Sequence, residues 1–157
     1  MADNKLQKQF RREVASLQLQ MQEKANGVDV VVGTKEDPIV TDSDLIPIKH
    51  YFMDGVYVRE MTMKKGIAVV GAIHKHLHMC FLLTGRITVI NEKETIDHIA
   101  PCFIISTPGI KRVLYAHEDS IWFNTHKNPS NTEDIKQLER EIVAITYEEY
   151  EEYIKNK

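Results

Sequence analysis

The first hydrophobic pattern along the chain has helical spacing. Apolar residues recur at steps of three or four positions with polar residues between them: Leu6, Phe10, Val14, Leu17 and Met21. Such spacing aligns the apolar side chains on one face of a helix. Asp3 is a suitable N-cap and Asn26-Gly27 a suitable stop, so we expect a helix between them. Its apolar face packs either on the rest of this chain or on another chain.

From residue 56 to about residue 126 the pattern changes to short β-type segments. The segments are VYVREMTM, IAVVGAI, MCFLLT, RITVI, TIDHI, CFIIS, KRVLYA and SIWFNTH. Turn signals such as Asp54-Gly55, Lys65-Gly66 and Pro108-Gly109 precede or separate them. Closely spaced strands without intervening helices predict an antiparallel sandwich or a small barrel. The run VDVVV at 28–32 predicts one further strand.

Near the C-terminus the pattern is helical again. Ser130 and Glu133 match a capping box, and an apolar stripe follows at Ile135, Leu138 and Ile142. Thr146 and Glu149 repeat the box ahead of a glutamate-rich stretch that contains several tyrosines. We therefore expect one or two helices here, with their tyrosines packed on the β-structure or on a neighbour.

The length of 157 residues fits one core domain. We expect a helical arm at 1–27, a β-barrel at 28–128 and a helical extension at 129–157. The chain is 43% hydrophobic and 27% charged with a formal net charge of -3, which argues against broad binding of nucleic acid.

The sequence favours a cytoplasmic protein. No apolar run approaches the roughly 20 residues of a membrane span, and the first residues lack the apolar core of a signal peptide. Cys80 and Cys102 each lie in apolar sequence, which predicts reduced, buried thiols.

Three of the seven histidines lie close together in the β region, at His74, His76 and His78. The glycines Gly66 and Gly85 close the β segments on either side. With these glycines fixed, the spacing resembles the first motif of the cupins, in which a glycine is followed by His-x-His, a glutamate and a second glycine. Ala72 and His74 then occupy the two histidine positions, and His78 occupies the glutamate position.

The second cupin motif also keeps its spacing but few of its side chains. Pro101 stands at its glycine, Thr107-Pro108-Gly109 at its turn, Arg112 at its histidine and Ala116 at its asparagine. The resemblance implies a mainly β protein, a double-stranded β-helix barrel, here flanked by an N-terminal amphipathic helix and one or two C-terminal helices.

The resemblance also implies a metal site. Cupins place three imidazoles and one carboxylate around Fe, Mn, Ni or Zn, with open positions for substrate. His74 and His78 occupy matching positions, and a third ligand would come from His76 or from a late strand, such as His126. Arg112 opposes this interpretation, because a guanidinium beside a dication is repelled unless an anion lies between them.

The alternative use of the same residues is recognition of a small anion. Arg112 offers a planar set of donors suited to carboxylate or phosphate, and Tyr115 is within reach by sequence. A surface ion pair of Arg112 with Glu118 or Asp119 is the purely structural alternative.

Two functions are therefore compatible with the sequence. The run from GVYVREM to PGIKRVLYAHEDSIW also resembles small cupin-like proteins of tailed phages, which implies a phage-encoded protein of the host cytoplasm or the virion. This resemblance and the altered metal motif favour a non-enzymatic binding or assembly protein that forms homo-oligomers through residues 1–25. The alternative is a metal-dependent cupin enzyme that uses His74 and His78 on a small anionic or sugar-like substrate.

Overall fold

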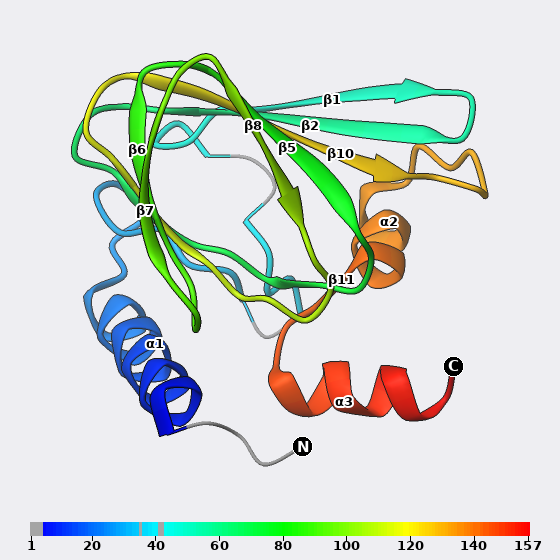
Figure 1. Cartoon of the computed structure of the whole chain (residues 1–157), viewed down its shortest axis with the longest axis horizontal. Helices are drawn as coiled ribbons and strands as arrows, with labels where there is room; N and C mark the ends of the chain where they lie inside the picture. Colours follow the sequence, from blue (N-terminus) through cyan, green and yellow to red (C-terminus); the bar gives the residue numbers. More distant parts are fainter. Residues whose placement is uncertain (1–4, 35, 41–42) are drawn as a thin grey trace.

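The computed structural model describes residues 5–34, 36–40 and 43–157 (Figure 1). Its helices are α1 (Lys5–Lys24), α2 (Ile135–Ile142) and α3 (Tyr147–Lys155). Its strands are β1 (Ile48–Met53), β2 (Val56–Met63), β3 (Ala68–Val70), β4 (Ile73–His74), β5 (His78–Thr84), β6 (Arg86–Ile90), β7 (Thr95–Ile99), β8 (Cys102–Ser106), β9 (Val113–Ala116), β10 (Ser120–Lys127) and β11 (Val143–Ala144). Every segment between residues 56 and 126 that the sequence predicts as a strand contains one.

Two antiparallel sheets face each other and enclose the core. One has the strand order β1-β2-β10-β5-β8 and the other β3-β9-β6-β7. Side chains from both sheets meet in one buried cluster: Met61, Met63, Cys80, Leu82, Ile87, Val89, Leu114, Ala116 and Trp122. The predicted mainly β architecture is thus confirmed, although the hydrogen-bonded ladders of the described strands do not join into one closed cylinder.

The turn between β5 and β6 requires glycine for a steric reason. Gly85, which links β5 to β6, has φ +82°, a value that side chains with a Cβ rarely adopt. A Cβ at this position would also lie 2.5 Å from the carbonyl oxygen of Asp119 and would collide with the Ser120 hydroxyl. Glycine at this position therefore lets the β5–β6 turn pack against the start of β10.

The strand predicted at 28–32 is wrong. After α1 ends at Lys24, the side-chain oxygen of Asn26 accepts hydrogen bonds from the amides of Val28 and Val30, at 2.8 and 3.2 Å, and from the amide between them. A turn therefore takes the donors that a strand would use. The stop at Asn26-Gly27 is confirmed to within two residues, whereas Asp3 lies outside the described residues.

Strand β1 was not predicted, and it pairs with β2 through the turn at Asp54-Gly55, which was. Met53 and Val56 flank this turn as Cα partners. The sequence of β1, IKHYFM, alternates between half-buried and exposed positions, but both sets contain apolar residues. That mixture hides the period of two by which a strand is recognised.

Only the middle of the apolar stripe of α1 packs against the rest of this chain. Phe10 and Val14 are buried, whereas Leu6 is 64% exposed. The guanidinium of Arg11 lies 3.9 Å from the centre of the Tyr147 ring and 3.6 Å from a carboxylate oxygen of Glu92. These contacts hold α1 against α3 and the turn between β6 and β7.

The C-terminal helices begin where local capping is strongest. The predicted cap at Ser130 is wrong: α2 is capped by Asp134, whose side chain accepts from the amides of Lys136 and Gln137. The second predicted cap is confirmed, since Thr146 accepts from the amide of Glu149 at the start of α3.

The segment between α2 and α3 reaches the barrel. Leu138, Ile142 and Val143 pack with the fully buried Tyr57 of β2. Residues 143–144 form β11, which pairs with β4 and fixes its position. Both cysteines are free thiols. Cys80 is buried as predicted, whereas Cys102 is only half-buried. Within the described ranges, none of the helices has the length and apolar character needed to cross a membrane.

Candidate metal centre

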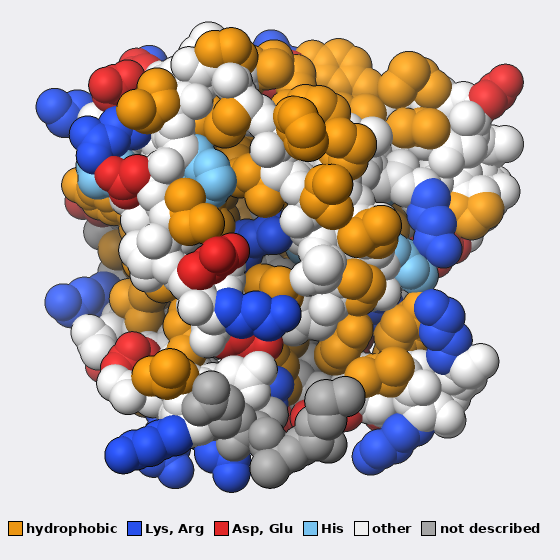
Figure 2. Space-filling model, viewed as in Figure 1, with side chains coloured by type: hydrophobic (Ala, Val, Ile, Leu, Met, Phe, Trp, Pro, Cys, Tyr) orange, Lys and Arg blue, Asp and Glu red, His pale blue; other side chains and the backbone are white. Residues whose placement is uncertain are grey.

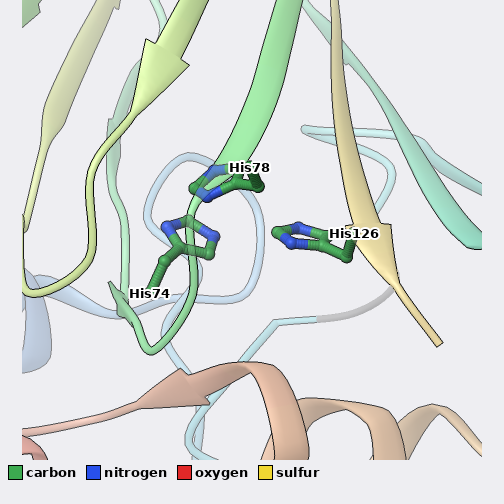
Figure 3. A group of neighbouring side chains, drawn as sticks. All are labelled: His74, His78 and His126. Carbon is green, nitrogen blue, oxygen red and sulfur yellow. The ribbon is translucent and has the colours of Figure 1, made fainter. Parts of the chain in front are cut away.

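Three histidines from separate strands converge at one end of the larger sheet (Figure 3). His74 ends β4, which pairs with β11, and His78 begins β5. Strand β10 is antiparallel to β5, with Thr125 opposite Met79, and this register places His126 beside His78. The sheet pairing therefore joins residues that are about fifty positions apart in the sequence.

The three rings face one another at short range. The ring centroids of His74 and His78 lie 4.1 Å apart, those of His78 and His126 4.6 Å, and those of His74 and His126 5.1 Å. One nitrogen of each ring lies within 4.8 Å of the others. Metal–imidazole bonds are about 2.1 Å long, so two nitrogens bound to one tetrahedral ion lie roughly 3.4 Å apart. Side-chain rotations that bring the three nitrogens about 1 to 1.5 Å closer together would therefore place all of them on one ion.

The environment keeps these imidazoles neutral. Burial lowers the pKa of His78 to about 4, and the nearby Arg112 charge also lowers it. Burial is likewise the main cause that holds the pKa values of His74 and His126 well below 6.5, and the charge on neighbouring imidazoles acts in the same direction. A neutral imidazole has a free lone pair, which is the form that binds a metal.

The hydrogen bond of His78 decides which of its nitrogens keeps a free lone pair. Its Nδ1 lies 3.2 Å from the carbonyl oxygen of His76, so Nδ1 carries the proton and donates. The lone pair then belongs to Nε2, a buried atom without a hydrogen-bond partner. A buried polar atom without a partner is costly, and a metal ion would remove that cost.

A buried polar network supports His126. Its ring stacks on Tyr57, with centroids 6.1 Å apart. The Tyr57 hydroxyl accepts from Nε of Arg59 at 3.0 Å, and the Arg59 guanidinium pairs with Glu139 of α2 at 3.1 Å. The charge of Arg59 is thus balanced within the protein. The ion pair also links α2 to β2, the strand whose Tyr57 is the Cα partner of His126.

Arg112 lies inside the barrel, so its interpretation as a surface ion pair is wrong. The residue is 9% exposed, and Asp119 pairs with Lys64 instead. Nη1 of Arg112 lies 3.9 Å from the sulfur of Cys80. Because burial raises the pKa of this thiol to about 11, Cys80 stays neutral and supplies no countercharge. Among the described residues, no carboxylate lies within ion-pair distance of this guanidinium.

Two other residues considered from the sequence lie away from the cluster. Tyr115 is 41% exposed, between core residues Leu114 and Ala116, so it points out of the barrel and cannot share a pocket with Arg112. His76 turns toward α2, with Nε2 3.1 Å from the carbonyl oxygen of Glu141. Of the two candidates for a third ligand, only His126 joins His74 and His78.

Ser106 was missed by the sequence analysis. It ends β8 as the Cα partner of His78 and is fully buried. Its hydroxyl has no hydrogen-bond partner. A buried serine at the end of an apolar strand gives no signal in the sequence, because only the pairing of β8 with β5 brings it next to a histidine.

Comparison with known proteins identifies the fold. No family model matches this sequence, and no curated protein matches it. Among solved structures, salicylate 1,2-dioxygenase from Pseudaminobacter salicylatoxidans superposes with a TM-score of 0.52 at 12% identity, over 78% of this chain and 34% of that chain. The present chain thus spans about a third of the dioxygenase.

Smaller cupins match over most of their length. A cupin superfamily protein from Desulfitobacterium hafniense has a TM-score of 0.49 at 10% identity, over 62% of this chain and 95% of that chain. An RmlC-like cupin from Shewanella frigidimarina has a TM-score of 0.49 at 14% identity, over 66% and 92%. The cupin-type fold predicted from the spacing of the two motifs is confirmed, at the level of fold alone, by the match to the dioxygenase. The resemblance to phage proteins stays a prediction.

Proposed function

We propose that this cupin-fold protein binds one divalent transition metal through His74, His78 and His126 and uses it to bind and activate a small anionic substrate. The convergence of three neutral imidazoles, one with a buried and unpartnered Nε2, carries the proposal. Sequence reasoning favoured a non-enzymatic assembly role, which remains untested. The geometry of the three rings gives more support to the metal-dependent alternative.

The ligand set narrows the choice of metal. Imidazole nitrogens suit Fe, Ni and Zn better than Mn, which prefers oxygen ligands, and three ligands from one side leave positions open on the other. The cluster itself contains no carboxylate. A dication there keeps its full charge, which favours an anionic ligand at the open positions. Such an ion, when bound, polarises a substrate oxygen as a Lewis acid.

Arg112 supports the choice of an anion. A buried guanidinium without a carboxylate partner is unfavourable, because its charge is removed from water without compensation. Arg112 lies against Cys80, which is two positions after His78 on the same side of β5, so the guanidinium is near the cluster. An anion between the ion and Arg112 would screen the two positive charges from each other and supply the missing countercharge.

The remaining groups position the ligand. The unpartnered hydroxyl of Ser106, next to His78 in the sheet, can donate a hydrogen bond to a ligand oxygen. Cys80, Leu82 and Trp122 make the barrel interior apolar beyond the cluster and so restrict water. A small ligand with a carboxylate or phosphate group fits this combination of one apolar region and few polar contacts.

A Co²⁺ titration tests the metal site. We expect about one ion per chain, with visible absorption bands that report the ligands. His126→Ala should weaken Co²⁺ binding by at least about a hundredfold, a larger loss than the removal of an outer-shell partner causes. The matched control is His76→Ala, which removes a histidine close in sequence and outside the cluster. Equal effects of the two substitutions would refute the assignment.

The anion is tested separately on the Co²⁺-loaded protein. Oxalate and inorganic phosphate serve as probes, and a change in the Co²⁺ spectrum reports their binding. Arg112→Met should weaken anion binding at least tenfold and leave Co²⁺ affinity equal or higher, whereas Arg112→Lys should lose less, because it keeps the charge. Anion binding that is unchanged in Arg112→Met would remove Arg112 from the site.

A further inference from the structure

On strands β5 and β8, the larger sheet carries apolar residues on its outer side as well as on its inner side. Strand β5 reads HMCFLLT and β8 reads CFIIS, without the alternation of apolar and polar residues expected for a sheet with one face in water. Cys80 and Leu82 of β5 point into the core, and their neighbours along the strand point outward. A strand with apolar residues on both sides is typical of a sheet that is covered on both sides.

The outward-facing side chains form one continuous patch, which we call the outer apolar face. Its members are Tyr51, Met53, Met79, Phe81, Leu83, Phe103, Ile105 and Phe123. Phe81 is the Cα partner of both Phe103 and Phe123, so three aromatic rings lie in a row across β8, β5 and β10. The ring of Tyr51 meets that of Phe123 edge-on at 6.4 Å and continues the patch toward β1. Figure 2 shows hydrophobic side chains gathered over these strands.

The described part of the chain leaves this face open. Phe103 is 61% exposed and Ile105 58%. The segment best suited to cover it, α1, is held elsewhere by Arg11, which contacts Glu92 and Tyr147. Contiguous apolar surface of this kind marks a site of association in proteins that otherwise present polar surfaces.

We propose that the outer apolar face binds the same face of a second copy of this chain. A contact around a two-fold axis requires a surface that complements itself, and apolar side chains do so because they bring no like charges together. The nearest charges lie on the β1–β2 side of the face, where Glu60, the Cα partner of Phe123, is 8% exposed and accepts hydrogen bonds from Tyr51 and Lys49, at 2.6 and 3.2 Å. An apolar centre with a polar rim is the usual composition of such interfaces.

The exposed area is sufficient for a stable pair. Large side chains each offer about 200 Å² of surface, and the main members of the face expose about half of theirs, so the face presents roughly 600 Å² of apolar side chain. Backbone and rim atoms add to this, which brings the total close to the about 800 Å² per partner of a standard interface. Face-to-face packing of two copies would bury the outer apolar face of each and leave the core-facing side of each sheet unchanged.

This interface differs from the one predicted at residues 1–25, and a single experiment separates them. Sedimentation equilibrium of the purified full chain measures the dimer dissociation constant. Phe103→Glu and Ile105→Glu place a charge in the centre of the proposed contact, and each should raise the constant at least about thirtyfold. The matched control is Leu6→Glu, which alters a residue 64% exposed on the apolar stripe of α1 and should leave the constant unchanged.

Two results would overturn the proposal. One is a wild-type chain that stays monomeric at about 100 μM, well above the concentration at which an interface of this size associates. The other is a dimer that dissociates with Leu6→Glu, or that survives both substitutions on β8. Because Phe103 and Ile105 point away from the core, circular dichroism and the thermal midpoint should show that both variants remain folded.

Discussion

Acidification of the metal-free protein should expose the cost of burying neutral imidazoles. His78 has its pKa lowered from 6.5 to about 4, mainly by burial. Above pH 6.5 the residue is neutral in the folded and the unfolded chain, so its titration does not change the free energy of unfolding. Below pH 6.5 the unfolded chain takes up a proton that the folded chain refuses until about pH 4. Stability is therefore present at neutral pH and lost as the pH falls through this interval.

The size of the effect follows from the pKa values. At about 1.4 kcal/mol per pKa unit, a drop from 6.5 to about 4 corresponds to about 3 kcal/mol of unfolding free energy. His74 and His126 act in the same direction, because their pKa values are also lowered. A loss of this size is a large part of the 5–15 kcal/mol by which proteins of this size are stable.

Urea denaturation in the presence of a chelator, from pH 7 to pH 4, measures the loss. Between these limits the wild-type chain should lose about 3 kcal/mol more than His78→Asn, in which residue 78 cannot titrate. The control His117→Gln alters a half-buried histidine that contacts Thr88 outside the cluster, and it should retain the extra loss that His78→Asn removes. If wild type and His78→Asn lose stability in parallel, the cluster is not buried in its neutral form.

Two other predictions concern the framework around the site. Gly85→Ala should destabilise by more than about 3 kcal/mol in urea, since it combines φ +82° with a collision against Ser120, whereas Gly27→Ala, at φ +73° in open space, should cost only about 1 kcal/mol; similar losses would show that the turn can shift. Glu139→Gln should cost about 3 kcal/mol, because it removes the countercharge of Arg59, whose side chain is only 16% exposed, and a loss below about 1 kcal/mol would show that water screens the Arg59 charge.

The strands were predictable because each buries one side against the core and ends at a turn residue. The pattern failed where local side chains compete with the ladder. Asn26 captures the amides that the run VDVVV would have paired, and Asp134 replaces Ser130 as the cap of α2 because it stands directly before the apolar stripe. The outcome of such competition depends on which acceptor the folded chain places next to each backbone amide, and the pattern of apolar positions does not record it.

The site was predictable in part. His74 and His78 followed from their spacing to two glycines, and His126 from its place on a late strand. The role of Ser106 depends on strand register, because β8 must pair with β5 before Ser106 lies beside His78. The burial of Arg112 depends on the packing of the two sheets, because Arg112 precedes β9 of one sheet and contacts Cys80 of β5 in the other. Tyr115 does not meet Arg112, because alternation along β9 turns its side chain outward. Sequence spacing identified candidates, and only sheet pairing decided which of them meet.

The position of a bound ion tests the central claim most directly. Crystals of the protein grown with Co²⁺ or Zn²⁺ and measured at the absorption edge of the metal would show the ion by its anomalous signal. The account predicts one strong peak about 2.1 Å from Nε2 of His78 and bonded to one nitrogen each of His74 and His126. A peak elsewhere, for example at His76 beside α2, or an empty cluster at saturating metal, would contradict it.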